Sequence, residues 1–561
     1  MLISTRSFHA LRDPSLKCCV ELSFAANEQL DVQGAMLLEN DRIESHDDAR
    51  RGLNFTTIIY RPRAAFDLMF QNATIIQIAE KYKPLWALDS VGALLQWDME
   101  TYMPLGSSKP RGFTIAQTQL LRQERILQLA DLVSKAEKST DLNDSETGFL
   151  RVLKRDLNYY TKVPPELLEA IARTATEGTV VWREARKKSD FSMFKPYLEK
   201  MVGLKRQEAE KLGYQRHPYD ALMDRFEEEI TTDDVDRIFS PLRSELKGLL
   251  TKVLSAGKFG SSHSIEEVSY EVAAMKRVNE DILKILQMPQ MTFRMDISTH
   301  PFTTSMSIED VRITTRYEGK DFKASLYSTV HESGHAIYDL QIDPSLDYTP
   351  LSRGTSLGIH ESQSRFWENF IGRSREFVKR IYPNLKANLP FLVQYSVEDV
   401  YRYVNSVKPS LIRVAADELT YNFHIMVRYE LEKKLIRGEM EVAEAPGMWS
   451  DLMEKYVGIR PRNDAEGILQ DVHWSGGMFG YFPTYSLGNV IAGMIYNRAQ
   501  KDLDLKTIVA NGELVRIKNW LKEKLHRYGA VYSPKELQKR AFGESYEPHW
   551  LIKYLQEKYL S

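Results

Sequence analysis

Residues 321–342 read DFKASLYSTVHESGHAIYDLQI, and this stretch decides how the rest of the chain is interpreted. Its apolar residues recur at helical spacing. On one helix, His331 and His335 would lie one turn apart on the same face and could bind one cation. Glu332 would lie beside them, where it could act on a metal-bound water, as in other HExxH sequences. The stretch therefore predicts the zinc-binding helix of a hydrolase, and Gly334 within it predicts close backbone packing or room for the ligands.

A catalytic zinc site needs a third protein ligand. His360-Glu361-Ser362-Gln363 begins a second helical pattern, and Glu361 could complete a site of two His and one Glu. Such a site leaves a position open for water, whereas structural zinc usually has four protein ligands. Two simpler interpretations remain: two surface histidines on a solvated helix, and an acidic residue favourably placed in a helix's first turn.

Composition excludes several classes of protein. Lys+Arg total 75 and Asp+Glu 77, so no basic field favours nucleic acid. The only cysteines are Cys18 and Cys19, which excludes a disulfide framework and argues against cysteine-bound zinc. The chain has no apolar run of about 18 residues and no leader-like apolar segment, so we expect no membrane association. A cytoplasmic enzyme fits these observations best.

The chain divides at about residue 68. Residues 1–68 show no sustained period and predict an atypical extension, poorly ordered or upstream of the true start. Residues 69–561 are overwhelmingly helical in pattern and predict one large all-α domain. Val311-Arg-Ile-Thr-Thr-Arg-Tyr317 alternates and is β-branched, which predicts a strand just before the zinc helix. That strand could present an edge to an extended peptide, or it could be a structural strand of a small sheet.

The stretch 470–485 is dense in glycine and aromatic residues and contains His473, Tyr481 and Tyr485. Peptide hydrolysis at zinc requires donors that stabilise the oxyanion, and a His or Tyr on such a loop could supply them. The alternative is an aromatic core packed beside a turn.

Arginines could distinguish an exopeptidase from an endopeptidase. Arg312, Arg316, Arg413, Arg460 and Arg462 occur near these motifs. Most single arginines on helices are surface charges. One buried in the cleft could instead bind a substrate's terminal carboxylate with two hydrogen bonds.

Several motifs taken in order resemble one known family, the carboxypeptidase Taq-type metallocarboxypeptidases. The matching segments span about residues 69–561 and exclude the extension. Besides the zinc pentapeptide and His360-Glu-Ser-Gln363, they are Trp97-Asp98, Met103-Pro104, Met295-Asp-Ile-Ser-Thr-His-Pro-Phe302, Asp310-Val-Arg-Ile-Thr314, Ile412-Arg-Val-Ala-Ala-Asp417 and Gly467-Ile-Leu-Gln-Asp-Val-His-Trp474.

The resemblance implies a large helical, gluzincin-like metallopeptidase fold with a long, deep cleft and a small β-sheet next to the zinc helix. It implies one catalytic zinc per chain, with cobalt possible, broad removal of single residues from peptide C-termini, and a homodimer. Carried over by position, His331, His335 and Glu361 are the metal ligands and Glu332 is the general base. Arg413 and, less surely, Arg312 are candidates for binding the substrate carboxylate. His473, Tyr481 and Tyr485 are candidates for the oxyanion donors.

The leading hypothesis is thus a zinc carboxypeptidase in which Glu332 assists attack by a zinc-bound water. A zinc oligopeptidase that cuts peptides internally is the alternative. A non-catalytic peptide-binding protein on a degenerate enzyme fold is disfavoured, because the sequence retains Glu332.

Overall fold

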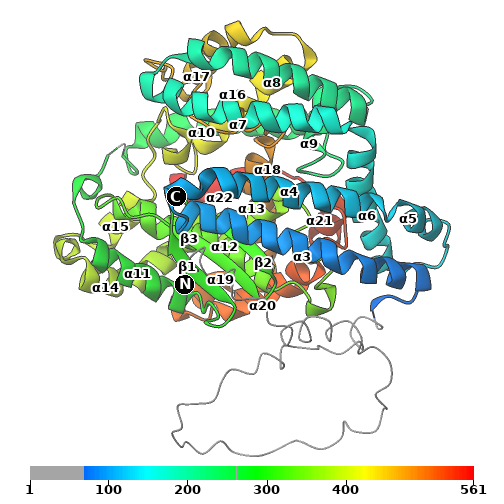
Figure 1. Ribbon diagram of the computed structural model, residues 1–561. Coiled ribbons are helices and arrows are strands. Elements are labelled where there is room, and N and C mark those ends of the chain that lie inside the picture. Colours follow the sequence, from blue (N-terminus) through cyan, green and yellow to red (C-terminus); the bar gives the residue numbers. More distant parts are fainter. Residues whose placement is uncertain (1–68, 261) are drawn as a thin grey trace, which may run out of the picture. The chain divides into compact units, whose positions relative to one another are not determined.

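A computed structural model describes residues 69–260 and 262–561, so the predicted extension 1–68 lies outside the described residues. The described part is almost wholly helical and contains one three-stranded sheet (Figure 1). The predicted all-α class, with a small sheet next to the helix that carries His331, is confirmed. The boundary at residue 68 and the long cleft stay predictions.

The helices before the sheet are α3 (Ala73–Thr101), α4 (Ser108–Leu127), α5 (Ala130–Ala136), α6 (Asp144–Lys162), α7 (Pro165–Lys188), α8 (Phe191–Leu212), α9 (Pro218–Met223), α10 (Thr232–Ala256) and α11 (Val272–Ile285). The helices that follow the sheet begin with α12 (Phe322–Leu340), which carries His331. After it come α13 (Leu357–Arg365), the π-helix η6 (Phe366–Gly372), α14 (Arg375–Asn388), α15 (Val397–Val404) and α16 (Tyr421–Arg437). The last are α17 (Ala445–Val457), α18 (Pro483–Asp502), α19 (Leu505–Asn511), α20 (Val515–Lys524), α21 (Pro534–Phe542) and α22 (His549–Leu560).

Helix boundaries follow local capping chemistry. Thr231 caps α10, and Asp234 reaches back to the Thr231 backbone, so the two form a capping box. Gly257 ends α10 in the left-handed conformation. Helix α12 runs from Phe322 to Leu340, within two residues of the range that the apolar period predicts.

The sheet consists of β1 (Phe293–Ile297), β2 (Thr303–Ser307) and β3 (Asp310–Thr315), in the order β1-β3-β2. β1 pairs parallel to β3, and β2 pairs antiparallel to it. The strand predicted before the zinc helix is therefore present, but it is the central strand. The suggestion that it offers an edge to a peptide is wrong, because strands pair with it on both sides.

One face of the sheet packs on α12. Val311 and Ile313 of β3 form a fully buried cluster with Ala336 of α12. Successive strand residues point to opposite faces, so Arg312 points away from α12. Its guanidinium lies 4.5 Å from the ring centroid of Trp97 on α3.

Helix α13 lies between α12 and α18, and each contact depends on a glycine. A Cβ on Gly334 of α12 would lie 2.7 Å from the carbonyl oxygen of Gln363 on α13. A Cβ on Gly488 of α18 would lie 2.7 Å from the side chain of Glu361. Farther along α18, a Cβ on Gly493 would lie 2.6 Å from the backbone nitrogen of Leu551 on α22. These close approaches account for Gly334 inside a helix, as the sequence predicts.

Across the described residues, no helix combines the length and the apolar character needed to cross a membrane.

Candidate active site

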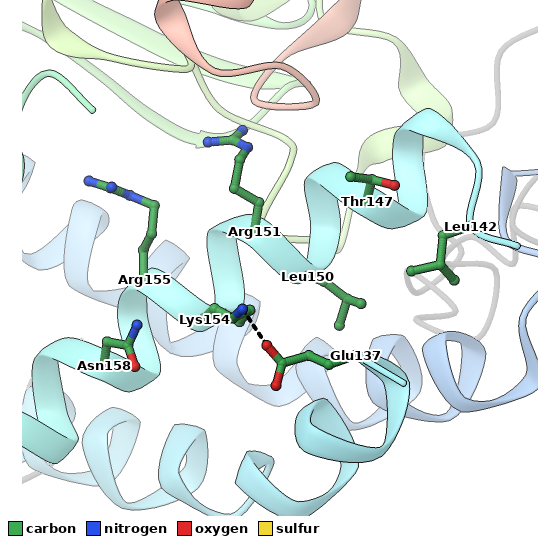
Figure 2. A pocket seen from close by; sticks show the side chains of 8 residues that line it. All are labelled: Glu137, Leu142, Thr147, Leu150, Arg151, Lys154, Arg155 and Asn158. Atoms are coloured by element: carbon green, nitrogen blue, oxygen red, sulfur yellow. Dashed lines mark ion pairs between the residues drawn. The ribbon is translucent and has the colours of Figure 1, made fainter. Parts of the chain in front are cut away.

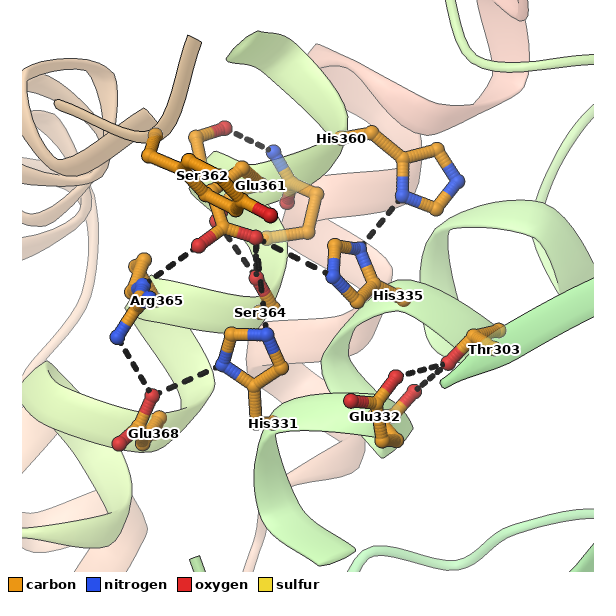
Figure 3. Close-up of polar contacts among 12 residues, drawn as sticks. Thr303, His331, Glu332, His335, His360, Glu361, Ser362, Ser364, Arg365 and Glu368 are labelled. Atoms are coloured by element: carbon orange, nitrogen blue, oxygen red, sulfur yellow. Dashed lines mark hydrogen bonds and ion pairs between the residues drawn. The ribbon is translucent and has the colours of Figure 1, made fainter. Parts of the chain in front are cut away.

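Helices α12 and α13 bring three potential metal ligands together. His331, His335 and Glu361 each offer a ligand atom, and these atoms all lie within 4.8 Å of one another. The Nε2 atoms of His331 and His335 lie 3.6 Å and 3.4 Å from Oε2 of Glu361 (Figure 3). Two imidazole nitrogens and one carboxylate oxygen are a typical donor set for a catalytic divalent ion.

Glu361 lies deeper in its helix than the sequence suggests. Ser356 caps α13, so the helix begins at Leu357 and Glu361 is beyond its first turn. A second carboxylate fixes this start, because Glu227 accepts hydrogen bonds from the Gly358 backbone and the Ser356 hydroxyl. The interpretation of Glu361 as a first-turn acid is therefore wrong.

Charged neighbours keep Glu361 ionised. Arg365 donates to Oε1 of Glu361 over 2.7 Å. Burial by itself would raise the pKa of Glu361, but Arg365 and the two imidazoles lower it well below its usual range. The side chain is therefore an anion at any physiological pH.

Glu332 of α12 is buried and lies beside the three potential ligands. The hydroxyl of Thr303 on β2 donates to Oε2 of Glu332 over 2.7 Å (Figure 3). This bond fixes one carboxylate oxygen, and Oε1 receives no hydrogen bond from the described residues. The sheet thus orients the residue that the sequence assigns as general base.

A second wall of the site consists of residues from α16, from the segment 470–485 and from the loop before α16. Arg413 is buried and donates through Nε and Nη2 to Asp471 and through Nη1 to the Tyr421 hydroxyl. Arg428 also pairs with Asp471. Tyr421 joins this wall to the ligands, since the Arg365 guanidinium lies 4.3 Å from its ring centroid.

The three predicted oxyanion donors cluster in this second wall. Nε2 of His473 lies 3.3 Å from the Tyr485 hydroxyl, and the rings of Tyr481 and Tyr485 are 5.2 Å apart. Burial lowers the pKa of His473 to about 3 and raises that of Tyr481 to about 12. The charge of Glu361 contributes to the pKa of both tyrosines, which indicates that they lie near the ligands. All three side chains are therefore neutral and able to donate a hydrogen bond.

Comparison with known proteins agrees with this geometry. Residues 77–559 match the model of the family described as carboxypeptidase Taq (M32) metallopeptidase. The chain belongs to the carboxypeptidase Taq family. It is therefore a metal-dependent carboxypeptidase, that is, a peptide hydrolase, and internal cleavage is not favoured.

Relatives match over nearly their whole length. Thermostable carboxypeptidase 1 of Pyrococcus furiosus is 47% identical over 496 residues, which cover 88% of this chain and 99% of the relative. Carboxypeptidase 1 of Bacillus subtilis is 38% identical over 481 residues, covering 83% and 94%. The solved structure of Pyrococcus furiosus carboxypeptidase in its apo-Mg form superposes with a TM-score of 0.87 and covers 88% of this chain and 100% of that chain.

Not all arginines that the sequence singles out lie at this carboxypeptidase site. Arg312 pairs through two hydrogen bonds with Asp310 and packs on Trp97, and no contact joins it to the ligands among the described residues. The others form pairs near the surface: Arg316 with Glu318, Arg460 with Asp451 and Glu454, and Arg462 with Glu466. Of the five arginines named from the sequence, all within the described residues, Arg413 alone is both buried and joined to the site.

A separate pocket of about 420 Å³ lies along α6 (Figure 2). It is lined by three basic residues, but each is paired: Arg151 with Glu228, Lys154 with Glu137, and Arg155 with Asp224. None of the predicted site residues lines it, so the carboxypeptidase chemistry lies elsewhere.

Sequence reasoning missed the residues that contact the second ring nitrogen, Nδ1, of His331 and His335. Nδ1 of His331 lies 2.9 Å from Oε2 of Glu368, and Nδ1 of His335 lies 2.6 Å from Nδ1 of His360. Asp339 lies 3.0 Å from His360. One signal was available, because Asp339 follows His335 by four residues and so lies on the same face of α12.

Proposed function

We propose that this carboxypeptidase is a cytoplasmic zinc enzyme, a homodimer, that removes single residues of many kinds from peptide C-termini. The observation that carries the proposal is the convergence of His331, His335 and Glu361 beside a buried, oriented Glu332. Three protein ligands are the number typical of catalytic zinc. Cobalt could occupy the same donors, because such sites select partly by metal availability.

The outer contacts of the ligands support this fit. Each histidine directs Nε2 towards Glu361 while its Nδ1 has a polar partner. Zinc-binding histidines are usually held in this way. When bound, the ion would supply Lewis-acid activation of water and of the scissile carbonyl.

Glu332 is the proposed general base. Thr303 holds its Oε2, so its other oxygen is left to accept the proton of the attacking water. The same oxygen then donates that proton to the nitrogen of the departing amino acid. His473, Tyr481 and Tyr485 are the proposed donors to the developing oxyanion, because they are neutral hydrogen-bond donors near Glu361.

Arg413 is the proposed binding residue for the C-terminal carboxylate. A guanidinium has five N–H groups. Asp471 accepts one from Nε and one from Nη2, and Tyr421 accepts one from Nη1. Each terminal nitrogen therefore keeps one N–H that could donate to a substrate carboxylate. Arg312 remains the weaker candidate, since its partners are Asp310 and Trp97 and, among the described residues, no contact joins it to the proposed ligands.

A peptide and its C-terminally amidated twin, each digested by zinc-loaded protein and followed by mass spectrometry, test the proposal. We expect loss of single C-terminal residues from the free peptide and little cleavage of the amide. Equal cleavage of both, or internal fragments, would refute the exopeptidase assignment. The zinc-loaded Glu332→Gln variant serves as the control for contaminating peptidase.

A further inference from the structure

His360, the residue before Glu361, contacts both His335 and Asp339. It is not one of the three converging residues, yet its Nδ1 lies 2.6 Å from Nδ1 of His335 (Figure 3). Its other nitrogen, Nε2, lies 3.0 Å from Oδ1 of Asp339. The hydroxyl of Ser305 on β2 donates to Oδ2 of Asp339 over 2.5 Å. A continuous row of polar contacts thus runs from His335 to the sheet.

The chemistry of the ligand determines the direction of every bond in this row. Nε2 of His335 must offer its lone pair to an ion, so a neutral His335 carries its hydrogen on Nδ1. That hydrogen is donated to Nδ1 of His360, which must then hold a lone pair. His360 therefore carries its own hydrogen on Nε2 and donates it to Asp339.

Packing fixes the ring of His360 in the orientation that this row requires. A Cβ on Gly354 would lie 2.7 Å from Cδ2 of His360, so the imidazole fills the space that this glycine leaves. On another side the Tyr338 ring centroid lies 5.3 Å away. These two contacts oppose a turn of the imidazole that would exchange its two nitrogens.

The two metal-binding histidines are thus held in different ways. Glu368, which holds His331, is a carboxylate paired with Arg365 and Arg373. His335 instead meets the imidazole of His360, and the carboxylate of Asp339 contacts the other nitrogen of that ring.

We propose that His360 and Asp339 are positioning residues that hold His335 in its metal-binding tautomer. His360 is the acceptor for the Nδ1 hydrogen of His335, and Asp339 fixes the hydrogen of His360. The inference rests on the proposed zinc site and concerns metal affinity rather than the chemical step.

The test compares zinc dissociation constants, measured by competition with a chromophoric chelator at one pH. His360→Phe removes the acceptor and should weaken binding by roughly 10- to 100-fold. His360→Gln restores an acceptor oxygen and should recover much of the loss. His526→Phe is the control, because His526 is a buried histidine that packs on the same Tyr338 ring and contacts no proposed ligand.

Each outcome decides between the interpretations. Equal losses of zinc affinity in His360→Phe and His526→Phe, or no recovery of affinity in His360→Gln, would overturn the positioning role of His360 and Asp339. Wild-type protein that binds no zinc would overturn the proposed function, and with it the positioning role of His360 and Asp339. If His360→Phe does not fold, nitrogen-15 NMR of histidine-labelled wild type decides, since the zinc-loaded protein should show His360 with its hydrogen on Nε2. Hydrogen on Nδ1 of His360 would refute the proposal.

Discussion

The two walls of the site differ in how the chain builds them. The ligand wall consists of α12 and α13, where His331 and His335 are one turn apart and Glu361 comes from the next helix. The second wall, where we propose that the substrate carboxylate binds and which we therefore call the substrate wall, gathers Arg413, Asp471 and their neighbours from separate segments around a buried ion pair. The proposed metal ligands are thus encoded on two consecutive helices, whereas the substrate wall depends on long-range packing. Substitutions in the two walls should have different signatures.

Removing a ligand should produce the largest effect. Glu361→Ala leaves two histidines as ligands and leaves Arg365 with Glu368 as its carboxylate partner, so we expect loss of stoichiometric zinc and of all peptide release. Metal content after dialysis, measured beside wild type, checks this. A variant that retains zinc as tightly as wild type would show that Glu361 is not the third ligand.

Glu332→Gln should separate chemistry from metal binding in the same wall. The amide cannot accept a proton, so we expect a loss of roughly 10²- to 10⁴-fold in kcat/KM. Zinc affinity should stay at the wild-type value, because Glu332 is not a ligand. Activity close to wild type would contradict its role as general base.

Arg413→Lys should act on the substrate wall alone. A lysine keeps the charge but cannot bind a carboxylate with two parallel bonds, so kcat/KM for free peptides should fall by about 10- to 100-fold. Zinc affinity should not change. Arg312→Lys is the comparison variant, and a larger loss there would move carboxylate binding to the sheet.

Gly334→Ala should loosen the contact between α12 and α13. The added methyl meets the Gln363 carbonyl and the Ser364 backbone, and overpacking of this kind costs about 1–3 kcal/mol of stability. Gly92→Ala is the matched control, since a Cβ there meets nothing within 4 Å on another helix. That change should be neutral or stabilise by up to about 1 kcal/mol in urea unfolding. Equal behaviour of the two variants would contradict the close packing at Gly334.

The last effect concerns the pH dependence of stability and comes from one buried carboxyl group in the substrate wall. Glu432 on α16 accepts hydrogen bonds from Trp474, Gly480 and Tyr219, and burial raises its pKa to about 7. Between its unfolded pKa near 4.5 and about 7, the folded state keeps a proton that the unfolded state has lost. Stability should therefore fall with rising pH in that window, by at most about 1.4 kcal/mol per pH unit, and level off above it.

Glu432→Gln should remove this contribution to the slope of unfolding free energy against pH. Urea unfolding at several pH values between 4.5 and 8 measures it. An unchanged slope in the variant would show that Glu432 ionises in the folded state as it does in the unfolded one.

Sequence reasoning worked best where the contacts are local. The apolar period located α12, the HExxH spacing identified His331 and His335, and Gly334 indicated close packing. It located the strand before α12 but left open whether that strand is an edge or an inner strand of a small sheet, because an alternating pattern cannot distinguish the two. It missed Glu368, which lies in the π-helix that continues α13 and contacts His331. Pairing across the fold, as between Arg413 and Asp471, leaves no local pattern.

The stacking of α13, α18 and α22 has a consequence for the order of synthesis. Gly488 lets α18 pack closely against Glu361, and Gly493 lets α22 pack closely against α18. A nascent chain on the ribosome carries both histidines of α12 long before α22 has emerged. Full peptidase competence would then come late in translation, once α22 has folded against α18.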